Sequence, residues 1–104
     1  MGTQANSSVM HIVLFKWKEG AAPEQIERVV AGLRGLKDKI PGILDLSCGP
    51  DFSGRSQGFA LALVVRFVDR AALDAYGPHP AHQHVVHTEI DPIRADVLAF
   101  DYDE

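Results

Sequence analysis

Two segments of this chain, residues 9–18 and 58–67, are rich in β-forming residues and are apolar on both faces of the strand that each one predicts. In the first segment, alternate positions place His11, Val13, Phe15 and Trp17 on one face and Met10, Ile12 and Leu14 on the other. In the second, one face carries Phe59, Leu61, Leu63, Val65 and Phe67, and the other carries Ala60, Ala62 and Val64. A sheet built from such strands needs cover on both of its faces.

Hydrophobic periodicity and the Pro and Gly residues predict the other elements. Helices are expected from Pro23 to Ile40, from Arg70 to Tyr76 and from Pro80 to Asp91, and further strands at residues 42–49 and 96–102. The resulting order, β-α-β-β-α-α-β, is close to the ferredoxin-like motif, an α+β fold in which an antiparallel sheet carries its helices on one face. The helices therefore leave the second face of the sheet bare. A second copy of the chain is the simplest cover, and it predicts a homodimer whose two sheets form a dimeric α/β barrel.

The composition limits the class of protein. A chain of 104 residues forms one domain, predicted at residues 9–104, and residues 1–8 are expected to be a disordered leader because they lack the features of a signal peptide. The net charge of −4, without clusters of Lys or Arg, argues against nucleic acid as a partner. No apolar run is long enough to cross a membrane. The single Cys48 cannot form an internal disulfide, which fits a cytoplasmic protein.

Four of the five histidines lie in residues 73–87. On the helix predicted after Pro80, His82 falls on the apolar stripe, whereas His84 and His87 point away from it. A lone histidine on an apolar face is often a hydrogen-bonded core residue, so the position of His82 alone does not indicate catalysis. The pair His84 and His87, with Asp91 one turn later, could bind a metal but faces solvent without a cysteine. A solvated polar face is favoured, and neither a metal site nor a cofactor is expected.

Four segments together resemble a known family. They are His11-Ile-Val-Leu-Phe-Lys-Trp17, residues 58–67, His79-Pro-Ala-His82 and Val97-Leu-Ala-Phe-Asp-Tyr102. From about Met10 to Asp103 the chain resembles the stress-responsive A/B barrel (Dabb) family, and this resemblance also implies a dimeric barrel.

Within that family the chain is similar to polyketide cyclases of the olivetolic acid cyclase type, which close a linear polyketide by aldol condensation without a metal or organic cofactor. The resemblance implies that His82 is the general base, that Tyr76 assists it and that His11 lies in the pocket. One departure is Leu61, which replaces a further pocket histidine of those cyclases.

These residues suggest a chemistry. A neutral His82 could remove a proton from carbon next to a carbonyl, with the Tyr76 hydroxyl as donor to the enolate oxygen. The predicted substrate-binding residues are His11, Val13, Phe15, Trp17, Phe59, Leu61 and Leu63, which would enclose a hydrophobic, carbonyl-bearing small molecule. The alternatives are a non-catalytic stress-associated binding or scaffold dimer, in which His82 and Tyr76 only pin the helix to the sheet, and a cofactor-free monooxygenase by analogy of fold.

Overall fold

The computed structural model of the protein describes residues 7–104, so most of the predicted leader, residues 1–6, lies outside the described residues. The strands are β1 (Val9–Trp17), β2 (Ile43–Pro50), β3 (Leu61–Phe67) and β4 (Arg94–Asp103). The helices are α1 (Pro23–Arg34), the 3₁₀ turn η1 (Gly35–Asp38), α2 (Arg70–Tyr76), α3 (Pro80–Val85) and the π-helical turn η2 (Val86–Ile90). No helix within residues 7–104 has the length and apolar character to cross a membrane.

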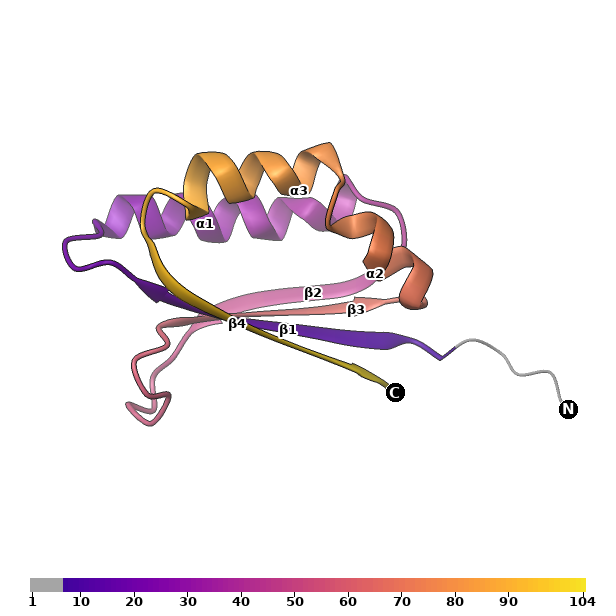
Figure 1. Ribbon diagram of the computed structural model, residues 1–104, viewed down its shortest axis with the longest axis horizontal. Helices are drawn as coiled ribbons and strands as arrows, with labels where there is room; N and C mark the ends of the chain where they lie inside the picture. Colours follow the sequence, from indigo (N-terminus) through magenta and orange to yellow (C-terminus); the bar gives the residue numbers. More distant parts are fainter. Residues whose placement is uncertain (1–6) are drawn as a thin grey trace, which may run out of the picture.

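The four strands form one antiparallel sheet in the order β2-β3-β1-β4. Figure 1 shows α1 and α3 side by side on one face of the sheet, with α2 at the end of that layer, while the opposite face carries no helix. The predicted ferredoxin-like α+β class is therefore confirmed. We call the two faces of the sheet the helical face and the outer face.

The core lies between the helical face and α1. Alternate residues of β1 and β3 point into it, as the period of two in an extended strand requires. Their partners come from the apolar stripe of α1 and from η1, and each fully buried aliphatic side chain contributes about 1.5–3 kcal/mol. The main buried residues are Val9, Val13 and Phe15 of β1, Leu61, Leu63, Val65 and Phe67 of β3, and Val29, Leu33 and Leu36 of the helices.

Three elements differ markedly from the sequence-based expectation, and the ends of β1, β2 and β4 differ by one or two residues. The helix expected to reach Ile40 is α-helical only to Arg34 and then tightens into a 3₁₀ turn at Gly35, a residue that weakens an α-helix. The strand expected from Gly58 begins at Leu61, because Gln57 and Gly58 adopt positive φ angles of 58° and 90°. The helix expected from Pro80 widens into the π-helical η2, where the Asp91 amide donates to the Val86 carbonyl at 2.8 Å.

The outer face is apolar over β4 and β1. Leu98, Phe100 and Tyr102 of β4 have exposed fractions of 52%, 63% and 45%. Their β1 neighbours in the register, Leu14, Ile12 and Met10, are half-buried. This row of large side chains leaves a contiguous apolar surface without a partner in the single chain.

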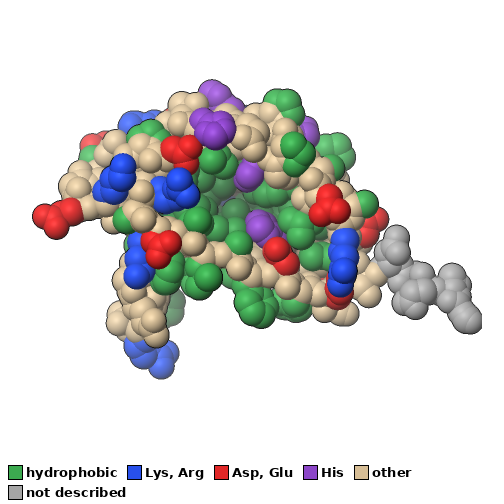
Figure 2. All heavy atoms as spheres, in the orientation of Figure 1, with side chains coloured by type: hydrophobic (Ala, Val, Ile, Leu, Met, Phe, Trp, Pro, Cys, Tyr) green, Lys and Arg blue, Asp and Glu red, His purple; other side chains and the backbone are tan. Residues whose placement is uncertain are grey.

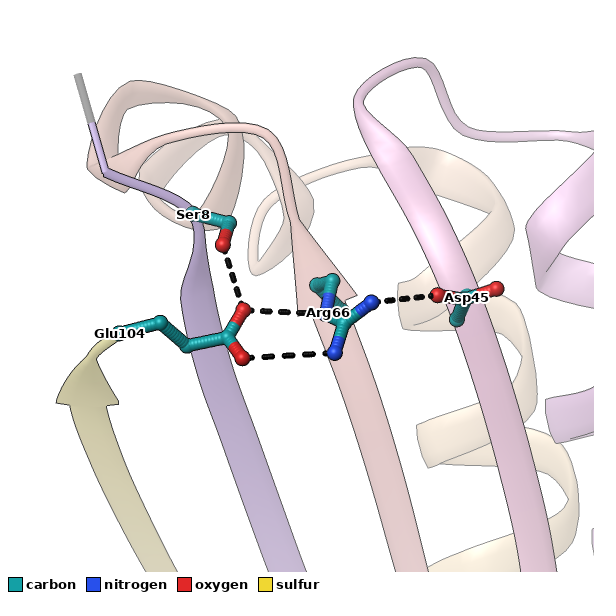
Figure 3. Close-up of polar contacts among 4 residues, drawn as sticks. All are labelled: Ser8, Asp45, Arg66 and Glu104. Atoms are coloured by element: carbon teal, nitrogen blue, oxygen red, sulfur yellow. Dashed lines mark hydrogen bonds and ion pairs between the residues drawn. The ribbon is translucent and has the colours of Figure 1, made fainter. Parts of the chain in front are cut away.

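A charged network borders this surface (Figure 3). The Arg66 guanidinium on β3 pairs with Asp45 on β2 and with Glu104 after β4, with N–O distances of 3.0 Å to each carboxylate. The Ser8 hydroxyl donates to the Glu104 carboxylate, and this bond lowers the pKa of Glu104, with the nearby Arg66 acting in the same direction. The network thus links residues on or beside all four strands.

Candidate functional site

A cavity of about 170 Å³ lies between the helix layer and strands β1 and β4. Figure 2 shows the molecule hollowed on this side, with hydrophobic and histidine side chains inside the hollow. An apolar cavity of about 150 Å³ holds one benzene molecule, so this space fits a ligand about the size of one substituted ring. The sheet contributes His11, Val13, Phe15, Leu63, Arg94 and Val97 to its wall, and the helix layer and its C-terminal turn contribute Leu33, Tyr76, His82, Val86, Ile90 and Asp91.

The chain turns sharply between α2 and α3, and this turn positions His82. The Asp69 side chain caps α2 by accepting from the Ala72 amide at 2.9 Å. The His79 side chain caps α3 by accepting from the Ala81 amide at 3.0 Å, and Pro80 occupies the first helical position, where a missing N–H has no cost. The side chain of His82 thereby enters the cavity wall from the first turn of α3.

His82 is oriented by a backbone carbonyl. Its Nδ1 lies 2.9 Å from the Gly77 carbonyl oxygen, and because a carbonyl only accepts, Nδ1 carries the hydrogen and the lone pair lies on Nε2. Burial lowers the pKa of His82 below its usual value, and this effect exceeds the opposing one of the Gly77 hydrogen bond. The imidazole is therefore neutral near pH 7, the form that a general base requires.

Tyr76 packs directly against His82, with the ring centroids 4.3 Å apart. It also meets Phe67 edge-on, and only 2% of its surface is exposed. Its hydroxyl is buried and has no hydrogen-bond partner within residues 7–104, and burial raises the pKa of the phenol. A buried hydroxyl left without a partner costs about 1–3 kcal/mol, so such a group in a native structure calls for an explanation.

His11 reaches the cavity from β1 and is held by Asp101. The two residues are opposite one another in the register of β1 and β4, and the His11 Nδ1 donates to the Asp101 carboxylate. The His11 ring also lies edge-on to Tyr76, with centroids 5.8 Å apart. Asp101 was not among the predicted site residues, although it lies in the segment Val97–Tyr102 that carried the family resemblance.

The structure brings six of the nine predicted site residues to the cavity wall: His11, Val13, Phe15, Leu63, Tyr76 and His82. The other three lie elsewhere. Leu61 is buried in the core, and Trp17 stacks on Phe15 with centroids 5.5 Å apart, outside the cavity wall. Phe59 precedes β3 because that strand starts late, and its ring lies under the Lys16 ammonium at 4.6 Å.

The sequence reasoning missed the wall formed by the end of the last helix. Val86 and Ile90 belong to the π-helical turn, a feature often found at functional sites, and Asp91 and Arg94 add charge to the wall. The Asp91 carboxylate lies 3.5 Å from the Arg94 guanidinium and 3.0 Å from Nδ1 of His87. The ideal helical period places Val86 and Ile90 on the same stripe as His82, so that pattern was a signal that could have added them to the site.

The histidines outside the cavity have other contacts. His84 is exposed, as the helical period predicted. His87 is also exposed, with Nε2 at 2.7 Å from the Gln83 amide oxygen and Nδ1 at 3.0 Å from the Asp91 carboxylate. Within residues 7–104, no three His, Cys, Asp or Glu side chains are grouped in a way that could hold a metal ion.

A family model described as the stress responsive A/B barrel domain, Dabb, matches residues 9–104. The chain belongs to the Dabb family. A stress-response A/B barrel domain-containing protein of Arabidopsis thaliana is 32% identical to it over 88 residues. These residues make up 84% of this Dabb chain but only 32% of the plant protein, so the chain spans about a third of the length of that relative.

Two solved structures resemble the Dabb chain over most of its length. A dimeric ferredoxin-like protein of unknown function from Thermobifida fusca is 27% identical, with a TM-score of 0.84 over 95% of this chain and 92% of the other. The hydroxynitrile lyase of Passiflora edulis also has a TM-score of 0.84, covering 94% of each chain. Its identity is 22%, so this second likeness shows a shared fold alone.

Proposed function

We propose that this Dabb domain binds a small hydrophobic molecule bearing a carbonyl group and acts on it as a lyase or cyclase, with His82 as general base. The observation that carries the proposal is the buried Tyr76 hydroxyl, which has no partner among residues 7–104, in a ring whose centroid lies 4.3 Å from that of a neutral histidine. A carbonyl oxygen of a ligand would give this hydroxyl the acceptor that it lacks. The apolar remainder of the wall favours a ligand whose other atoms are hydrophobic.

The proposed step is a proton transfer. Nε2 of His82 takes a proton from carbon next to the carbonyl, and the electron pair of the broken C–H bond forms an enolate. The Tyr76 hydroxyl donates a hydrogen bond to the enolate oxygen, where negative charge develops. In a cyclase the enolate carbon then attacks a second carbonyl, and the protonated His82 returns its proton to the alkoxide that forms there. In a lyase these steps run in reverse: His82 takes the hydroxyl proton, the C–C bond breaks, and the enolate carbon is protonated. Both roles use groups of the chain itself, so the proposal includes no metal or organic cofactor.

The volume of the cavity limits the size of the ligand. A space of about 170 Å³ is smaller than the roughly 300–1,000 Å³ of pockets that enclose drug-sized molecules. A compact ketone with a hydrogen on its α-carbon, or a short ketide, therefore fits better than a long linear polyketide.

We further propose that the protein is a homodimer in which a second copy covers the outer face. The apolar row of Leu98, Phe100 and Tyr102 supports this, because a stable interface needs an apolar patch of this kind. The relative from Thermobifida fusca is itself described as dimeric. A cytoplasmic location is also proposed, since Cys48 is a free, buried thiol.

The test is a comparison of His82→Ala with His84→Ala, the exposed histidine on the same helix. Both variants and the wild type are assayed for turnover and for binding, using as probes short ketide thioesters and aryl methyl ketones, which carry hydrogens on the carbon next to the carbonyl. We expect His82→Ala to lose about 10²–10⁴-fold in turnover and His84→Ala to match the wild type. Equal turnover in all three proteins would remove His82 from the role of base.

The second candidate is a binding or scaffold dimer without turnover. The tight packing of Tyr76 against Phe67 and His11 favours it, because the same contacts pin α2 to the sheet. Binding of the probes without conversion by the wild type would decide for this candidate.

A further inference from the structure

The turn between α2 and α3 contains a carbonyl group that two side chains share. The Gly77 carbonyl accepts from Nδ1 of His82 at 2.9 Å and from Nε2 of Gln83 at 2.7 Å. Nearby backbone amides bond elsewhere: the Ala81 amide donates to the His79 side chain and the His79 amide to the Tyr76 carbonyl. The two side chains therefore replace the amides that a further turn of helix would offer to a helix-terminal carbonyl.

The peptide after Gly77 has few other anchors. The next residue, Pro78, has no N–H to donate within the turn. A side-chain carbon added at Gly77 would meet no atom of residues 7–104 within 4 Å, so the turn is open on the side of that Cα hydrogen. The two side-chain donors are therefore contacts that can hold the direction of the Gly77 carbonyl.

The orientation of Gln83 is itself fixed. Its Nε2 faces the Gly77 carbonyl, so its Oε1 faces Nε2 of His87 at 2.7 Å. A flipped amide would set oxygen against oxygen at Gly77. Nδ1 of the same His87 ring lies 3.0 Å from the Asp91 carboxylate. Both partners are acceptors, so the imidazolium form of His87 donates to both and the neutral ring to one of them.

We propose that Gln83 is a positioning residue for His82. Its amide holds the Gly77 carbonyl where that oxygen accepts the Nδ1 hydrogen of His82, which keeps the lone pair on Nε2, the nitrogen that serves as base. Gln83 is absent from the cavity wall, so it acts through the carbonyl and not on the ligand. That Nε2 of His82 acts as a base rests on the proposed function. That Gln83 controls the tautomer of His82 does not rest on it.

The experiment measures the tautomer of His82 directly. Ligand-free, uniformly ¹⁵N-labelled protein is studied by long-range ¹H–¹⁵N correlation NMR above the pKa of the ring, in the wild type, Gln83→Leu and the control His84→Ala. We expect the wild type and the control to carry the hydrogen of His82 on Nδ1. In Gln83→Leu the ratio of the Nε2–H to the Nδ1–H tautomer should rise about three- to tenfold, which is the change that the loss of one hydrogen bond produces.

Two further variants keep the test decisive if Gln83→Leu does not fold. Gln83→Glu preserves the size of the side chain but removes the donor to Gly77, and His87→Ala removes the anchor of Gln83. Both should shift the tautomer ratio in the same direction, with His87→Ala giving the smaller shift. A wild type with its hydrogen on Nε2, or an unchanged ratio in these variants, would overturn the inference.

The NMR result is independent of catalysis. If no probe is turned over but the tautomer shifts in Gln83→Leu, the proposed function fails and the role of Gln83 stands. If His82→Ala abolishes turnover while Gln83→Leu leaves both the tautomer and the turnover rate unchanged, the role of Gln83 fails alone.

Discussion

Asp101 on β4 lies directly opposite His11 on β1, and its carboxylate accepts the hydrogen of the His11 Nδ1. The bond joins the edge strand to a residue of the cavity wall and lies beside the Tyr76 ring. The carboxylate thus fixes the imidazole at the end of the cavity where the proposed base is found.

The first prediction concerns this pair. Asp101→Asn replaces a charged acceptor by a neutral one, which weakens the bond to His11, and charge-assisted hydrogen bonds are about twice as strong as neutral ones. We expect turnover of the best probe to fall about tenfold. Asp103→Asn is the matched control, because that carboxylate pairs with Arg70 and not with a cavity residue. Steady-state kinetics of the two variants check the prediction, and equal losses would contradict it.

The second prediction concerns the Tyr76 hydroxyl. Tyr76→Phe removes a buried hydroxyl that has no partner in the described part of the chain, so the ligand-free protein should become more stable by about 1 kcal/mol. The same change should reduce turnover, because the donor to the enolate oxygen is lost. Urea denaturation and turnover assays measure the two effects, with His84→Ala as the control at an exposed residue outside the cavity wall. A loss of stability in Tyr76→Phe would show that the hydroxyl already has a partner.

The third prediction is a dependence on pH. Burial lowers the pKa of His82 below 6.5, so the unfolded chain takes up the proton first as the pH falls. The contribution of His82 to stability is complete above about pH 6.5 and is lost as the pH falls from there through the folded pKa. Urea denaturation at about pH 7.5 and 5.5 should show a larger loss for the wild type than for His82→Gln. Losses of the same size would place the pKa of the folded protein at its ordinary value.

The rate of turnover should also depend on the protonation of His82. Turnover at low substrate concentration should decrease at acid pH with a midpoint below 6.5, since only the neutral ring accepts a proton.

The fourth prediction concerns the outer face. Phe100→Asp places a carboxylate in the apolar surface that a second copy would cover, and burying an unpaired charge costs several kcal/mol. We expect a dimer for the wild type and a single-chain species for this variant in sedimentation velocity across a dilution series. Val68→Asp, at an exposed valine in the turn between β3 and α2, should remain dimeric. A wild type that stays single-chain at high concentration would refute the proposed homodimer.

Local sequence patterns determined most of the fold. The bounds of α2 follow from the Asp69 cap and the Gly77-Pro78 break, and the structure has the helix at Arg70–Tyr76 as expected. The alternation in β1 and β3 likewise sorted their residues into two faces, because an extended chain repeats every two residues. Capping and periodicity act within a few residues, so they can be read from the chain alone.

The tertiary structure decided which residues meet in the cavity. Phe59 was expected beside Leu63, but positive φ angles at Gln57 and Gly58 delay the strand and turn the ring toward Lys16. The contact of Asp101 with His11 depends on the register between the edge strand and β1, which joins residues 90 positions apart. Side chains from distant segments are brought together by packing and strand register, and neither is encoded in the pattern of a single element.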